Sequence, residues 1–439
     1  MTHTLIYPHT AVHNAAGHLE IGGCDVVDLA LELGTPLFIY DEQTLRDQCR
    51  AYRAAFGALT DRFEIVYASK AFSCRAMAEL VAQEGLWLDV ATGGELAAAR
   101  AAAFPPEHVC FHGNNKSVAE IEAGLDTGIG FFVVDSFEEI ERLEGSAAAR
   151  GRTQEVLVRV TPGVRPDTHD FVQTGQQDSK FGFGLADGRA AEAVRRLRDA
   201  PHLQLAGVHA HIGSQIFELD SYRREVEVLF VAVDEWRRDF GFECRIVNIG
   251  GGLGIRYTAA DRPSSITEFA EIAVGAVRDG AARHDIPMPR LFVEPGRSIA
   301  GKAAVTAYTV GTVKVIPGVR TYVAVDGGMS DNLRPMLYDS KYEAMLASKA
   351  EVPATEVVTV AGKHCESGDV LVRDVHVAPP APGDVLVTPG TGAYGYAMAN
   401  NYNAQPRPAV VLVGGGRARV IIERETWDDV LRLQRPLVP

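Results

Sequence analysis

The chain has 439 residues, of which 46% are hydrophobic and 23% are charged, so it is long enough for two hydrophobic cores and therefore two domains. Its formal net charge of −14 argues against binding to nucleic acid. No apolar run is long enough to span a lipid bilayer, so we expect no membrane association either. The six cysteines are scattered without C-x-x-C spacing and no secretion signal is visible in "MTHTLIYPHTAVHN", so we expect free thiols and a cytoplasmic location.

Strand-like and helix-like segments alternate from residue 61 to about residue 296. A helix is expected first, at 41–56. The short apolar runs that follow it are 63–68, 86–91, 108–113, 130–135, 155–160, 203–212, 245–249 and 290–294. Between them lie stretches of helical spacing at 74–83, 94–104, 118–125, 137–149, 190–198, 222–240 and 266–284. This alternation predicts a parallel sheet covered by helices, and eight strands in about 235 residues favour an α/β fold of the closed (β/α)8, TIM-like kind.

The texture changes after residue 297. Segments such as "AVTAYTVGTVKVI" and "AVVLVGGGRARVIIERE" are rich in β-branched residues, and glycine and proline are frequent between them. We expect a second, mostly antiparallel β-domain here. The predicted boundaries are 36–296 for the barrel and 1–35 together with 297–439 for the β-rich domain.

Polar or glycine residues follow nearly every predicted barrel strand. In chain order they are Lys70, Asp89, His112, Asp135, His211, Gly250–Gly252 and Glu294. For any one of them, a loop reaching water is the ordinary explanation. Because barrel enzymes collect their chemistry at the carboxyl ends of the strands, the whole set indicates a site.

The triple glycine of "NIGGGLGI" is typical of a phosphate site. A dinucleotide fingerprint is excluded because its third glycine position holds Ile255 and the motif follows the seventh strand. The segment "GRSIAGKA" matches a P-loop except at Ala303, where the magnesium-binding hydroxyl is missing. A phosphate site made by late barrel loops remains.

Lys70 in "YASKAF" suggests which phosphate this is. One explanation is an ion pair with Asp89 at the next strand end. The other is a Schiff base with pyridoxal 5'-phosphate, which needs a lysine, a phosphate cradle and a group facing the pyridine nitrogen. Glu294 is the candidate for that last position, and His211 could stack on the ring.

Seven motifs together resemble those of the diaminopimelate decarboxylases, which are fold-type III pyridoxal-phosphate enzymes related to alanine racemase. They are "YASKAF", "HAHIGSQI", "NIGGGLGI", "EPGRSIAG", "NLRPMLY", "KHCESGD" and "GAYGYAM". The resemblance runs from about Pro36 to Pro408. It implies decarboxylation of meso-2,6-diaminopimelate to L-lysine, the last step of lysine biosynthesis, by a homodimer with shared active sites.

The resemblance also implies a role for each motif residue. The cofactor would be bound by Lys70, through its Schiff base, and by Asp89, His211, Ser214, Gly250, Gly251, Gly252, Glu294, Pro295, Gly296, Arg297 and Tyr394. The substrate would be gripped by Arg297, Arg334, Tyr338, Glu366 and Tyr394, with Glu366 on its distal amine. Cys365 of the partner subunit would protonate the α-carbon after carbon dioxide leaves.

Several alternatives stay open. A sister decarboxylase acting on another basic or carrier-linked amino acid would keep the cofactor residues and change the substrate grip, and a non-catalytic cofactor carrier would resemble the barrel alone. His209 and His211 lie two apart and could be a metal pair of a barrel hydrolase, although we expect no metal. Cys365 could be an ordinary buried residue, and Arg334 and Tyr338 could share a helical face in a surface salt bridge.

Overall fold

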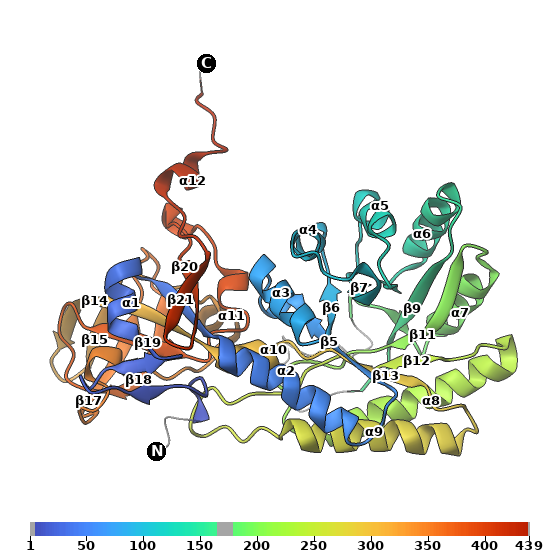
Figure 1. Cartoon of the computed structure of the whole chain (residues 1–439), viewed down its shortest axis with the longest axis horizontal. Helices are drawn as coiled ribbons and strands as arrows, with labels where there is room; N and C mark the ends of the chain where they lie inside the picture. The colour runs from blue at the N-terminus through green and yellow to red at the C-terminus, as the bar shows by residue number, and fades with distance from the viewer. Residues whose placement is uncertain (1–4, 165–178, 438–439) are drawn as a thin grey trace. The chain divides into compact units, whose positions relative to one another are not determined.

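The computed structural model describes residues 5–164 and 179–437 (Figure 1). By its internal contacts the chain forms two compact units. One consists of Gln48–Gly254 with Arg262–Ser298, and the other of Met1–Asp47 with Ile255–Asp261 and Ile299–Pro439. The first is called the barrel unit below, and the second the β-rich unit.

The barrel unit is built on a closed ring of parallel strands. Its strands are β5 (Phe63–Ala68), β6 (Trp87–Val90), β7 (Val109–Phe111), β8 (Phe131–Val134), β9 (Gln154–Thr161), β11 (Leu203–His209), β12 (Ile246–Asn248) and β13 (Arg290–Val293). Each strand pairs with the next, β13 pairs with β5, and a short β10 (Phe183–Gly184) pairs in parallel with the end of β9. The predicted (β/α)8 barrel is therefore confirmed, with every strand at its expected place in the sequence.

Helices separate the strands, as the spacing predicts. They are α3 (Arg75–Gln83), α4 (Gly93–Ala101), α5 (Val118–Thr127), α6 (Phe137–Ala149), α7 (Arg189–Asp199), α8 (Asp220–Phe240) and α9 (Ile266–Arg283). The helix expected ahead of the first strand is α2 (Glu42–Gly57), and a short α10 (Arg297–Ala300) follows the eighth strand. Local capping sets several starts: Ser117 and Ser265 each form a capping box with the glutamate three residues later.

Apolar side chains from the barrel strands fill the interior of the ring. Val66, Trp87, Cys110, Phe131, Val133, Leu157, Ala206, Ile246 and Phe292 form one buried cluster. Trp87 packs edge-on against Phe292 at 5.2 Å and stacks on Phe131 at 5.9 Å. The barrel is thus a packed core and not a pore, which leaves the strand ends to carry chemistry.

The β-rich unit contains two sheets. A small one joins β1 (Val12–His13), β2 (Leu19–Ile21) and β3 (Cys24–Asp25), and α1 (Val26–Leu33) follows it. The larger one contains β4 (Leu37–Asp41), β14 (Ala304–Ile316), β15 (Arg320–Val325), β16 (Met345–Leu346), β17 (Glu356–Ala361), β18 (Val370–Val377), β19 (Val385–Pro389), β20 (Ala409–Gly414) and β21 (Arg417–Ile422). Most of its pairings are antiparallel, whereas β15–β17 and β20–β4 are parallel. Two short helices, α11 (Arg334–Tyr338) and α12 (Trp427–Leu431), complete the unit.

Strand β4 lies inside the range 36–296 that the sequence analysis assigned to the barrel, yet it pairs with β14 and β20 of the larger sheet. Its five residues "LFIYD" are all buried, as in a central strand covered on both faces. Such a run has no alternation that would tell one sheet from another. Among the helices of the described residues, none is both long and apolar enough to cross a membrane.

Candidate active site

The carboxyl ends of the barrel strands bring polar side chains together. Lys70 lies in a 3-10 turn, η2 (Ser69–Ala71), directly after β5, and Asp89 lies near the end of β6. His112 follows β7, His209 ends β11, and Glu294 follows β13. These are the strand ends at which barrel enzymes place their chemistry.

Glu294 is the centre of a buried charge cluster. Its Oε1 lies 2.9 Å from His112 Nε2 and accepts a hydrogen bond of 2.6 Å from the Asn248 side-chain amide, and its Oε2 lies 3.2 Å from His209 Nε2. Burial would raise the pKa of this carboxyl, but His112 and His209 outweigh burial and hold the pKa well below its usual range. Glu294 is therefore an anion throughout the physiological range.

The pKa values of the two histidines in this cluster are shifted in opposite directions. Burial lowers the pKa of His209 to about 4 against the attraction of Glu294, so this ring is neutral. Burial also disfavours charging of His112, but Asp89 and Glu294 overcome it and the pKa of His112 is raised. This shift favours the protonated form of His112, whose positive charge stabilises the buried carboxylate.

The arrangement bears on the metal alternative. One ligand atom from each of His112, His209 and Glu294 lies within 4.8 Å of the others, and this is the one such group among the residues that the structure describes. His211, the second member of the predicted His-x-His pair, is outside it and accepts the Gly251 N–H at 3.3 Å through Nδ1. The raised pKa of His112 favours a protonated ring, which has no free lone pair for a metal.

The triple glycine after β12 forms a tightly constrained loop. A Cβ on Gly251 would lie 2.0 Å from the Glu294 carbonyl oxygen, and one on Gly250 would lie 2.7 Å from His211 Nδ1. Gly250 and Gly252 also have positive φ, at 65° and 115°. Close packing of bare backbone at a strand end is what a phosphate cradle requires. Hydrogen-bond donors lie on the same side of the barrel. They are Arg297 and Ser214, and the Arg297 guanidinium donates to Ser214 Oγ at 2.9 Å.

These features fit pyridoxal phosphate. The donor set includes a lysine, a buried anionic carboxylate and a glycine cradle, all at the carboxyl ends of one barrel. Lys70 is exposed, and within the described structure it forms no ion pair with Asp89. Lys70 thus acts on the Asp89 carboxyl only electrostatically, without a direct ion pair, and its exposed side chain is accessible to a ligand.

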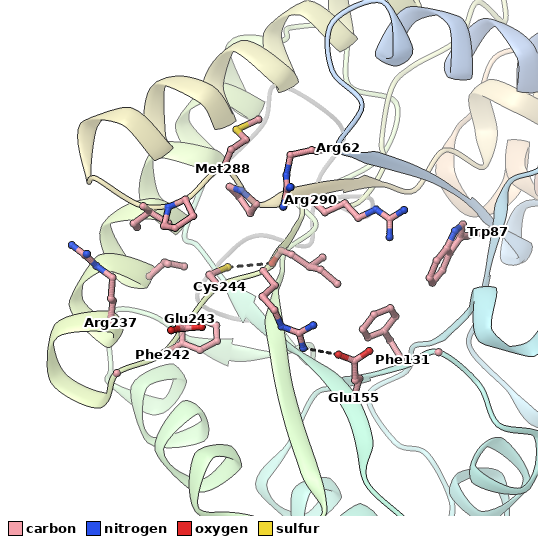
Figure 2. Close-up of a pocket in the computed structure, with 18 of the residues that line it drawn as sticks. Arg62, Trp87, Phe131, Glu155, Arg237, Phe242, Glu243, Cys244, Met288 and Arg290 are labelled. Atoms are coloured by element: carbon pink, nitrogen blue, oxygen red, sulfur yellow. Dashed lines mark hydrogen bonds and ion pairs between the residues drawn. The ribbon is translucent and has the colours of Figure 1, made fainter.

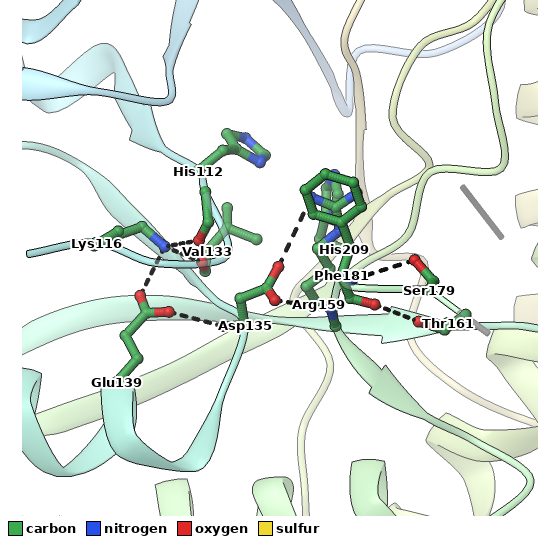
Figure 3. Close-up of polar contacts among 12 residues, drawn as sticks. His112, Lys116, Val133, Asp135, Glu139, Arg159, Thr161, Ser179, Phe181 and His209 are labelled. Atoms are coloured by element: carbon green, nitrogen blue, oxygen red, sulfur yellow. Dashed lines mark hydrogen bonds and ion pairs between the residues drawn. The ribbon is translucent and has the colours of Figure 1, made fainter. Parts of the chain in front are cut away.

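A second polar network lies at the ends of β8 and β9 (Figure 3). The Arg159 guanidinium packs 4.4 Å above the Phe181 ring and lies 3.8 Å from Asp135 Oδ2, while Asp135 Oδ1 accepts the Gly182 N–H at 2.9 Å. Burial lowers the pKa of Arg159 despite the attraction of Asp135, Glu294 and Asp89. Neither Arg159 nor Asn248 was predicted to belong to the site. The available signal was an arginine inside the apolar run "EVLVRV".

The remaining predicted residues belong to the β-rich unit. Arg334 begins α11, is buried, and donates from Nη1 to the Tyr342 hydroxyl. Its guanidinium lies 4.7 Å from the Tyr257 ring centroid, and no carboxylate among the described residues pairs with it. The surface salt bridge considered for Arg334 is therefore not formed. Tyr338, at the other end of α11, is half-buried.

Cys365 and Glu366 lie in the loop between β17 and β18, and both are exposed. Cys365 is thus not the buried structural cysteine of the alternative explanation. Glu366 Oε1 accepts the Gly368 N–H at 3.1 Å. Tyr394 has a φ of 59° and is close enough to Arg334 to interact with it electrostatically. The structure thus groups Arg334 with Tyr394.

A separate cavity of about 890 Å³ lies at the opposite, amino-terminal ends of the barrel strands (Figure 2). Trp87, Phe131 and Ile246 line it, and an Arg245–Glu155 ion pair of 2.5 Å lies at its edge. Because barrel chemistry collects at the carboxyl ends, this cavity is not the candidate active site.

Comparison with known proteins decides the family. The model for the pyridoxal-binding domain of pyridoxal-dependent decarboxylases matches residues 42–301. Diaminopimelate decarboxylase from Bacillus subtilis is 48% identical over 97% of both chains, and the enzyme of that name from Halalkalibacterium halodurans is 47% identical over 99% of both. The crystal structure of diaminopimelate decarboxylase from M. jannaschii in complex with L-lysine is 34% identical, with 98% of each chain covered and a TM-score of 0.91.

The chain belongs to the diaminopimelate decarboxylase family.

Membership of this family confirms the resemblance carried by the seven motifs, and with it a carboxy-lyase that uses pyridoxal phosphate. Because the relatives match nearly the whole chain, the similarity covers the β-rich unit as well as the barrel. A carrier protein that shares only the barrel is therefore excluded.

Proposed function

We propose that the chain converts meso-2,6-diaminopimelate to L-lysine and carbon dioxide, the last step of lysine biosynthesis. The observation that carries this proposal is the full-length similarity to enzymes of that name, at 48% identity over 97% of the chain. A sister decarboxylase with another substrate is the alternative, and it would share the barrel chemistry but not the residues that select the substrate.

Residues of the barrel unit would hold the cofactor. Lys70 would bind it covalently through its accessible amine, and the Gly250–Gly252 loop with Ser214 and Arg297 would hold its phosphate. Bound pyridoxal phosphate supplies a sink for the electron pair that decarboxylation leaves on the substrate. Glu294, anionic because His112 stabilises its charge, would keep a proton on the ring nitrogen.

Residues of the β-rich unit would hold the substrate and deliver the proton. Arg334 suits a planar carboxylate because its guanidinium donates in a rigid fork, and Tyr338 and Tyr394 would flank it. Glu366 would pair with the distal ammonium group. Cys365 would donate a proton from Sγ to the carbon that has lost its carboxylate, and Lys70 would then free the product.

We also propose that two subunits share each active site, with Lys70 from one and Cys365 from the other. Cys365 is exposed in the single chain, and so are two apolar residues of α11, Met336 at 42% and Leu337 at 47%. An apolar helix face beside functional residues is what a homodimer interface would cover. A cytoplasmic location is proposed from the free thiols.

The deciding assay is lysine formation from meso-diaminopimelate by the purified chain loaded with pyridoxal phosphate, with L,L-diaminopimelate and ornithine measured alongside. Lysine from the meso isomer alone supports the proposal, whereas turnover of ornithine alone would establish the sister enzyme. Lys70→Ala should abolish activity, and Lys314→Ala, which removes an exposed lysine of β14, should not.

Shared sites have a separate test by mixing subunits. Lys70→Ala and Cys365→Ala are each expected to be nearly inactive. After the two are mixed and allowed to exchange subunits, about a quarter of the sites should combine an intact Lys70 with an intact Cys365. No recovery in a mixture shown by mass spectrometry to contain hybrid dimers would contradict the proposal.

A further inference from the structure

The loop that carries Cys365 is held by a side chain far away in the sequence. The Cys365 N–H donates to Asn403 Oδ1 at 3.2 Å, and the same oxygen lies 3.3 Å from His364 Nδ1. The neighbouring amides are satisfied within the loop, since the His364 N–H donates to Asp369 and the Glu366 N–H to the His364 carbonyl. The hydrogen bond to Asn403 is thus the long-range contact that holds the Cys365 backbone.

The hydrogen-bond directions around Asn403 are determined by chemistry. An amide oxygen can only accept, so His364 Nδ1 must carry a proton to bond with it. In the neutral ring His364 Nε2 is then an acceptor, and it lies 2.8 Å from the Ser330 hydroxyl, which can donate. His364 is buried and packs 5.5 Å from the Tyr402 ring. One fixed histidine therefore orients the Asn403 amide, and that amide orients the Cys365 backbone.

The backbone of Asn403 suits this task. It adopts the left-handed conformation, with φ of 53° and ψ of 26°, which asparagine tolerates better than most residues. This conformation lets the amide reach back across 38 residues to Cys365. Glycine fits the same conformation without strain, so the side chain can be removed without disturbing the turn.

We propose that Asn403 is a positioning residue that directs the Cys365 thiol through its backbone N–H. The proposal rests on the proposed role of Cys365 as proton donor. In the structure, no hydrogen bond to a described residue holds Cys365 Sγ, so its direction depends on the backbone at 364–366. A displaced donor slows the proton transfer and leaves binding of substrate and cofactor intact, so the loss falls on kcat.

The test compares three variants of the full chain loaded with pyridoxal phosphate. Asn403→Gly removes the acceptor and should lower kcat at least tenfold with KM within twofold. It should also speed hydrogen exchange of the Cys365 amide at least tenfold, as measured by mass spectrometry. Asn403→Asp keeps an acceptor oxygen and should retain both properties within threefold. Asn401→Gly is the matched control, because among the described residues the Asn401 side-chain amide donates to Gln405 and Glu425 and does not contact the Cys365 loop.

A double-mutant cycle separates this inference from the role of Cys365 itself. In a Cys365→Ala background, Asn403→Gly should cause no further loss beyond twofold. An equal additional loss, a normal kcat for Asn403→Gly, or unchanged exchange of the Cys365 amide would overturn the positioning role. Normal turnover by Cys365→Ala alone would overturn the proton-donor role instead. If Asn403→Gly does not fold, Asn403→Ser, whose hydroxyl is too short to reach both partners, carries the same test.

Discussion

The buried pair of Lys116 and Glu139 allows a worked prediction about stability (Figure 3). Lys116 Nζ donates to Glu139 Oε1 at 2.7 Å and to the carbonyl oxygens of Gly113 and Val133 at 2.9 and 2.8 Å. The two side chains are only 1% and 3% exposed, and Glu139 Oε2 accepts the Asp135 N–H. The pair therefore joins the ends of β7 and β8 beside the candidate site.

Removing either partner leaves a charge in a dry environment, which costs about 3–5 kcal/mol. Glu139→Met should show the full loss at neutral pH, because the Lys116 ammonium keeps two carbonyl acceptors but no counter-charge. In Lys116→Met the remaining carboxyl can take up a proton. Burial already raises the pKa of Glu139 above 4.5 despite Lys116, and removing Lys116 raises it further.

This asymmetry gives the pH dependence a sign. An acid whose folded pKa exceeds its unfolded value binds more protons when folded, so stability falls as pH rises above the unfolded value. Lys116→Met should therefore be least destabilised near pH 5 and should lose up to about 1.4 kcal/mol more for each further pH unit. Glu139→Met should show no such decline, because it leaves no carboxyl group at this position.

Urea unfolding at pH 5 and 7.5, followed by tryptophan fluorescence, measures these differences. The double variant Lys116→Met with Glu139→Met should recover most of the loss because no buried charge remains. Glu79→Met is the control: its ion pair with Arg75 is exposed and should contribute less than about 1 kcal/mol. Losses below about 1 kcal/mol for both single variants at pH 7.5, or a pH-independent Lys116→Met, would refute the reasoning.

Three further predictions follow from single contacts. Gly251→Ala places a Cβ 2.0 Å from the Glu294 carbonyl oxygen, a backbone atom that cannot move aside. The variant should bind pyridoxal phosphate at least tenfold more weakly in an absorbance titration. An unchanged affinity would show that the glycine loop is not the phosphate cradle. Tyr342→Phe removes the hydroxyl that accepts a hydrogen bond from Arg334 and orients it. Loss of a charged hydrogen bond costs about 1.5 kcal/mol, so KM should rise about tenfold while kcat changes less. An effect on kcat alone would contradict this prediction. Burial raises the pKa of Glu95 from 4.5 to about 7, so its ionisation in the folded state costs stability as pH rises through that window. Glu95→Gln should remove this decline between pH 5 and 8 in urea unfolding, and an unchanged pH profile would argue against the raised pKa.

The barrel and its reactive face could be predicted from the sequence because their signals are local. Each buried parallel strand is a short apolar run, each helix has its own spacing and cap, and Lys70 and Glu294 stand at the strand ends where the pattern changes. Parallel strands place all their carboxyl ends at one rim, so order along the chain already implies proximity. The motif resemblance then gave the family, which the full-length relatives confirm.

Other features depended on which distant residues meet when the chain folds. His112 and Glu294 lie far apart in the sequence, and only closure of the barrel puts them 2.9 Å apart, where each shifts the pKa of the other. The placement of β4 in the larger sheet and the tie between Asn403 and Cys365 are of the same kind. Residue type and spacing determined the helices and strands of this protein and the polar residues at the carboxyl ends of its barrel strands. Tertiary packing alone decided its charge states and hydrogen-bond partners, because both depend on burial and on a few ångströms between atoms that the sequence does not relate.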